Sequence, residues 1–150
     1  MKKLGFRLKH KFFNAFREIF VHHHNSLEFR AKILALIIAA DEHPKVDNYI
    51  IVKRIADEIY KDDEDRANLL LMRTKEIIEQ IHVKKQYTVD ALVDSIVKNL
   101  KKVPRYAKKI DVDQLEDFLH TTYDEDIILY RRNILEFLER LKEETLEKLK

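Results

Sequence analysis

The chain has 150 residues, enough for one domain that buries roughly two-thirds of its unfolded surface. Its single glycine, two prolines and absence of cysteine exclude disulfides, thiolate metal sites and cysteine nucleophiles, and argue against glycine-rich phosphate loops and tight hairpins. Hydrophobic residues make up 45% and charged residues 37%, a balance typical of amphipathic helices. We therefore expect an all-α fold, a single compact bundle of six to seven helices, in the reducing environment of the cytoplasm.

The net charge of +2 is unevenly distributed. Residues 1–32 carry eight Lys/Arg and two Glu, a net +6, whereas the other 118 residues carry 21 Lys/Arg and 25 Asp/Glu, a net −4. A basic segment beside a mildly acidic body predicts a negatively charged partner, either a protein or an anionic membrane surface.

A first helix is predicted over about residues 3–22, because large apolar residues recur every four positions while cations lie off that stripe. This pattern is typical of a helix that lies in a lipid interface. The alternative is that the stripe packs on the bundle core. The segment has no apolar core of a signal peptide. The longest apolar run of the chain, Ile33 to Ala40, is far shorter than the roughly 20 residues that a transmembrane helix needs. The predicted docking residues are Leu4, Leu8, Lys9, Lys11, Phe12, Phe13, Phe16, Arg17 and Phe20. We divide the chain into residues 1–25, the basic amphipathic helix, and residues 26–150, a helical domain.

Capping signals and apolar spacing define the remaining helices. Asn25 with Glu28 forms a capping-box pattern at the start of a second helix through Ala40, which is nearly all apolar from Ile33 and should be central. Pro44 interrupts the helical pattern. Further caps are expected at Asp47, at Asp62 or Asp63, at Thr88 and at Asp111 or Asp113, with a short turn over 104–109 and a last helix after Tyr123-Asp124-Glu125.

Three consecutive histidines, His22, His23 and His24, suggest a divalent-metal site. Consecutive residues on a helix point about 100° apart, so the three rings cannot all reach one ion from a regular helix. From a loop, two of them could join a carboxylate such as Glu28 or Asp41 in holding an ion. Neutral imidazoles suit zinc, nickel or copper. The alternative is a solvated cluster at a helix end.

The body holds one dense basic cluster, around Tyr106. Six cations with an aromatic platform are compatible with a polyanion, but Asp111, Asp113, Glu116 and Asp117 follow at once and disfavour nucleic acid. The cluster consists of Lys98, Lys101, Lys102, Arg105, Lys108 and Lys109. No hydrolase, zincin or P-loop motif is present, so we expect neither an enzyme nor a small-molecule substrate.

Residues 33–47 resemble part of the tellurite-resistance TerB family: the apolar run Ile33 to Ala40 is followed by Asp41, an acidic turn, Val46 and Asp47. A fainter second copy lies over 115–138, with Tyr123-Asp124-Glu125-Asp126 as its acidic turn. The resemblance implies a TerB-like bundle over residues 26–141 and a non-enzymatic role in stress response or membrane-associated assembly, as in membrane-tied DnaJ-type co-chaperones. The chain departs from the family where Glu42 replaces the usual glycine and Ile50 the downstream Glu, which weakens the case for cation binding at this turn.

We therefore expect an interaction module of the cytoplasm, attached peripherally to the inner membrane face or to a protein partner, without a cofactor. The alternative is a metal-responsive helical protein that uses His22 to His24 with nearby carboxylates.

Overall fold

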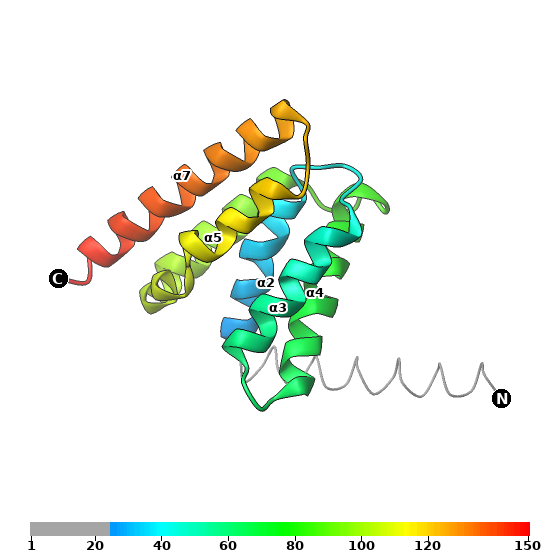
Figure 1. Cartoon of the computed structure of the whole chain (residues 1–150). Helices are drawn as coiled ribbons and strands as arrows, with labels where there is room; N and C mark the ends of the chain where they lie inside the picture. The colour runs from blue at the N-terminus through cyan, green and yellow to red at the C-terminus, as the bar shows by residue number, and fades with distance from the viewer. Residues whose placement is uncertain (1–24) are drawn as a thin grey trace.

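The computed structural model describes residues 25–150, a set of packed helices without a strand in that range (Figure 1). The α-helices and the two 3-10 helices are α2 (Asn25–Ile38), α3 (Val46–Ile59), α4 (Glu64–His82), α5 (Val89–Lys102), η1 (Pro104–Lys109), α6 (Val112–Leu115), η2 (Glu116–His120) and α7 (Glu125–Glu147). The predicted all-α fold, a single helical bundle, is confirmed. The predicted first helix lies outside the described residues.

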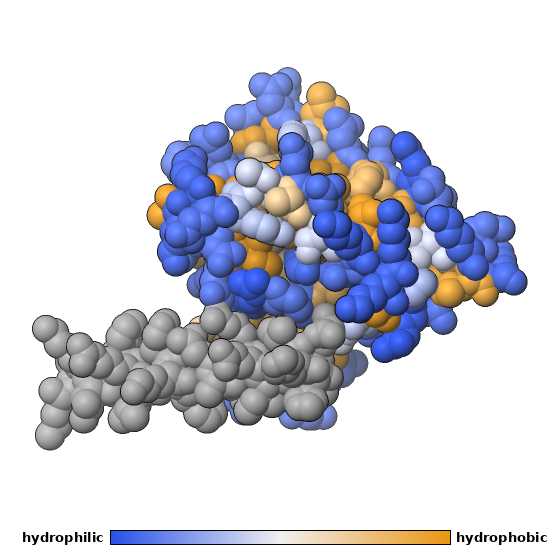
Figure 2. Space-filling view, turned by 180° about the vertical axis from the view of Figure 1, so that it is seen from behind, coloured by the Kyte–Doolittle hydropathy of each residue, from blue (hydrophilic) through white to orange (hydrophobic). Residues whose placement is uncertain are grey.

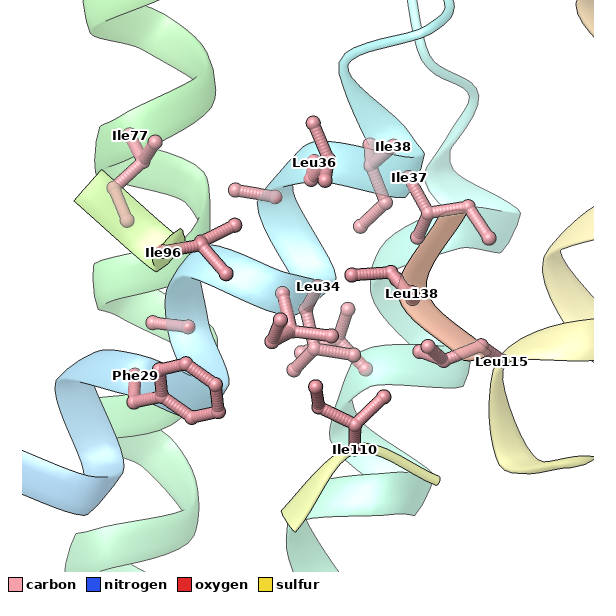
Figure 3. Close-up of a cluster of buried hydrophobic side chains, with 14 of the residues drawn as sticks. Phe29, Leu34, Leu36, Ile37, Ile38, Ile77, Ile96, Ile110, Leu115 and Leu138 are labelled. Carbon is pink, nitrogen blue, oxygen red and sulfur yellow. The ribbon is translucent and has the colours of Figure 1, made fainter. Parts of the chain in front are cut away.

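α2 is the central helix of the bundle and contacts α4, α5, η1 and α7. Every residue from Ile33 to Ala39 is buried, as are Phe29 and Ala31. In Figure 3 its side chains lie between Ile77 of α4, Ile96 of α5 and Leu138 of α7. Each large apolar side chain sealed from water contributes about 1.5–3 kcal/mol, so an apolar sequence on every side of the helix specifies this central place. The prediction of a buried second helix is confirmed.

The other helices pack on two sides of α2 (Figure 1). α4 packs against both α2 and α3, while α5, η1 and α7 pack on the other side. The His82 Nε2 atom lies 2.7 Å from the Ala39 carbonyl oxygen, so α4 ends beside the C-terminal end of α2. The Phe29 and Tyr106 rings stack with centroids 5.3 Å apart, so η1 lies beside the N-terminal end of α2.

Four helix starts are capped by side-chain oxygens that accept backbone N–H bonds, three of them at predicted caps and one at Asp124, in the segment predicted to precede the last helix. Asp63 accepts from Arg66 N at 3.1 Å, Thr88 from Ala91 N at 3.0 Å, Asp111 from Gln114 N at 3.1 Å and Asp124 from Asp126 N at 2.9 Å. Capping depends on residues within one turn of each other, which is why the sequence alone located these helix starts.

Thr88→Ala tests the contribution of one such cap. Thr88 is exposed, so the substitution removes the hydrogen bond to Ala91 N without opening a core cavity. We expect the free energy of unfolding to fall by about 1 kcal/mol. Urea denaturation followed by circular dichroism measures it. Thr88→Ser keeps the hydroxyl and should stay close to the parent; equal losses in the two variants would contradict the capping role.

Two predicted helix starts differ in the structure. α3 follows Lys45 without a side-chain cap, and Asp47 lies inside the first turn. Buried Asn48 closes this turn instead, since its Nδ2 donates to the Lys45 carbonyl at 3.0 Å. The Glu28 carboxylate, assigned by sequence to a capping box, is bound by Arg73 of α4 through Nε at 2.8 Å and Nη2 at 2.7 Å. A long-range ion pair has taken the place of a local cap.

The predicted sixth helix is divided into α6 and η2. The Phe118 carbonyl accepts hydrogen bonds from Thr121 Oγ1 at 3.0 Å and from Arg131 Nη1 at 2.7 Å. These bonds satisfy the carbonyl with side chains, so the segment ends in a tight turn instead of a continued α-helix.

Candidate functional site

All nine predicted docking residues, Leu4, Leu8, Lys9, Lys11, Phe12, Phe13, Phe16, Arg17 and Phe20, lie outside the described residues, as do the candidate metal ligands His22, His23 and His24. The docking surface and the histidine site therefore stay predictions from sequence.

Asp41, the remaining candidate metal ligand, lies in the turn after α2. Its Oδ1 accepts from the backbone N–H of His43 at 2.9 Å, a hydrogen bond that closes this turn. Within residues 25–150, no three His, Cys, Asp or Glu side chains gather in a way that could hold a metal ion. Asp41 is thus not brought together with a set of further ligands in this range.

Tyr106, considered in the sequence as a stacking platform for a polyanion, does not lie on the surface. Only 7% of Tyr106 is exposed, because its ring stacks on Phe29 inside the bundle. The Arg105 guanidinium lies over the same ring, 5.8 Å from its centroid. The ring contributes to the core and is not available to a nucleic-acid base.

The cations near η1 form a surface that we name the η1 basic face. It combines the last turn of α5, η1 itself and one residue of α2: Lys101, Lys102, Arg105, Lys108, Lys109 and Arg30. Lys98 lies one turn further back on α5. Burial lowers the pKa of the Lys109 ammonium, and the nearby charges of Arg30 and Arg105 lower it further. The sequence cluster therefore gains a member from a distant helix, which no local pattern could reveal.

These six cations have no carboxylate partner within residues 25–150. The ion pairs of that range involve Lys53, Arg54, Arg66, Arg73 and Lys150 instead. Two of the acidic residues that follow η1 in sequence are also already engaged. Asp111 caps α6 through Gln114 N, and Asp117 pairs with Arg54 of α3. The positive charge at this end of the bundle is thus not neutralised by neighbouring ion pairs.

A buried arginine, Arg131 of α7, forms the largest polar network of the described core. Its side chain is fully buried, and its guanidinium donates to the carbonyls of Ile37 (3.0 Å), Ile38 (3.3 Å) and Phe118 (2.7 Å) and to Thr121 Oγ1 (2.7 Å). The single hydroxyl proton of Thr121 is shared between the Phe118 carbonyl and Asn48 Oδ1, which lies 3.1 Å from Thr121 Oγ1. Burial lowers the pKa of Arg131, and the charge of Asp41 opposes that shift.

The network joins the C-terminal end of α2, the first turn of α3, the end of η2 and α7. The carbonyls at a helix C-terminus carry partial negative charge, which compensates the buried cation without a carboxylate. We did not predict this site from sequence. The signal was present, because Arg131 follows Ile127 and Ile128 and precedes Ile134 and Leu135 at the spacing of the buried stripe.

Two of the grooves on the surface of the described bundle lie away from η1. One, of about 250 Å³ between α5 and α7, is mainly apolar and includes Val89, Val93, Tyr130 and Phe137. The other lies between α3 and η2, where Ile50 and His120 flank the Arg54–Asp117 pair. Figure 2 shows one face of the molecule, on which hydrophilic residues dominate and apolar residues occur in small separate groups.

No helix within residues 25–150 has the length and hydropathy to cross a bilayer. Compared with models of protein families, with curated proteins and with solved structures, the chain has no significant match. The likeness to TerB domains therefore stays a prediction from the residues quoted above.

Proposed function

We propose that this chain is a non-enzymatic interaction module that docks reversibly on an anionic membrane surface through its basic, phenylalanine-rich first segment, residues 3–21. An acidic protein is the alternative partner for the same segment. The resemblance to TerB domains extends the proposal to stress-related assembly at the cytoplasmic face of the membrane.

The observation that carries the proposal is the pattern of residues 3–21, where an apolar stripe with several phenylalanines alternates with cations. Inserted rings contribute about 2–3 kcal/mol each, and each cation near anionic headgroups about 1 kcal/mol, which is enough for reversible attachment. The described bundle supports this proposal. Its central helix α2 already packs against α4, α5, η1 and α7, so the burial of α2 does not depend on residues 3–21.

Co-sedimentation of the full chain with lipid vesicles tests the proposal. We expect binding to vesicles that contain phosphatidylserine and little binding to pure phosphatidylcholine. Raising the salt concentration should weaken the binding, because the screening length falls from about 30 Å at 0.01 M to about 8 Å at 0.15 M. A chain that stays in the supernatant with anionic vesicles at low salt would refute the membrane proposal.

A further inference from the structure

We propose that the η1 basic face is a second contact with the same anionic lipid surface, so that the bundle lies with η1 and the start of α2 toward the headgroups. This inference rests on the proposed function, which it extends from residues 3–21 to the folded body.

The position of the η1 basic face supports this assignment. The Phe29–Tyr106 stack fixes η1 against the first turns of α2, and α2 begins at Asn25, directly after the basic segment. The cations of the body therefore lie at the end of the bundle where that segment joins it. Arg105 and Lys108 are exposed there and Arg30 is partly exposed, so these cations are open to solvent near the start of α2.

The chemistry of the face favours lipid headgroups over other anions. Its six cations have no ion-pair partner in the described chain. The members of the face are all cations, whereas a protein interface normally has an apolar centre. Single-stranded nucleic acid is usually bound through exposed aromatic rings, and Tyr106 is buried. Spread positive charge matches a headgroup layer.

The test is a comparison of two triple variants of the full chain on phosphatidylserine vesicles. The first variant neutralises three exposed members of the face by Lys102→Gln, Arg105→Gln and Lys108→Gln. The control, Lys45→Gln, Lys84→Gln and Lys85→Gln, removes the same charge from exposed positions in the turns at the other end of α2, where α4 ends beside Ala39. α2 alone is about 20 Å long, more than the screening length of about 8 Å at physiological salt.

We expect the first variant to bind roughly 100-fold more weakly, since each cation near the surface contributes a factor of about five. The control should change binding less than threefold, because its charges lie beyond the screening length. Equal losses in both variants would show that only net charge matters and would overturn the proposal. Tighter binding to a single-stranded oligonucleotide than to the vesicles would overturn the lipid assignment.

A site-specific label gives an independent measurement. The chain has no cysteine, so Lys108→Cys and Lys84→Cys each accept a single spin label. On vesicles, we expect relaxation by a lipid-bound paramagnetic reagent at position 108 and none at position 84. If the parent chain does not bind anionic vesicles, the proposed function fails. If it binds but the label at 108 is unaffected and the triple variant binds normally, only the inference fails.

Discussion

Arg131→Ala is expected to lower the free energy of unfolding by about 3–5 kcal/mol, because it removes a fully buried guanidinium and takes one donor from each of its acceptors. The carbonyl of Ile37 loses its only side-chain donor. The carbonyls of Ile38 and Phe118 each lose one of two hydrogen-bond donors. The truncation also leaves a cavity between α2 and α7. Urea denaturation, followed by circular dichroism, measures the loss.

The exposed neighbour Arg132 provides the matched control. Arg132→Ala removes the same side chain from the surface of the same helix and should cost less than about 0.5 kcal/mol. Arg131→Lys keeps the charge but not the planar array of donors, so its stability should fall between the parent and the alanine variant. An Arg131→Ala protein within about 1 kcal/mol of the parent would contradict the role of the network.

Phe12→Asp combined with Phe16→Asp should abolish binding to anionic vesicles. Two inserted rings contribute about 4–6 kcal/mol together, so their loss weakens binding by a factor of at least about 1,000, and the new carboxylates repel the headgroups. His10→Asp with Asn14→Asp adds the same charge at the same spacing on the opposite face of the predicted helix. This control should retain most of the binding.

The same pair of variants separates docking from the alternative in which the stripe packs on the bundle. If the stripe docks, Phe12→Asp with Phe16→Asp leaves the unfolding midpoint of the free protein close to that of the parent. If the stripe packs on the bundle, two carboxylates enter an apolar contact and the free energy of unfolding falls by several kcal/mol. A large loss of stability would therefore contradict the docking proposal.

The sequence predicted the features that depend on neighbouring residues. Caps at Asp63, Thr88 and Asp111 join atoms within one turn, and the apolar run over 33–40 specifies a buried helix whatever surrounds it. Features that join distant segments were not predicted. Glu28 meets Arg73 across 45 positions, and such a pairing depends on how α2 and α4 pack together.

Amino-acid type alone does not decide burial at two positions. Arg131 is charged, yet it occupies a position in the buried stripe of α7. Tyr106 lies among lysines and looked exposed, although Phe29 covers its ring. In both cases the periodicity or a distant partner, not the residue type, decides the burial.

The central place of α2 also determines how the described bundle unfolds. The α3–α4 pair and the α5–η1–α7 group meet mainly through α2, so neither group keeps its apolar surface covered once α2 departs. Loss of α2 exposes the apolar interior of both groups, so partial unfolding requires a large free energy. We therefore expect residues 25–150 to unfold as one cooperative unit, and cleavage inside α2 to release fragments that hold no stable tertiary structure.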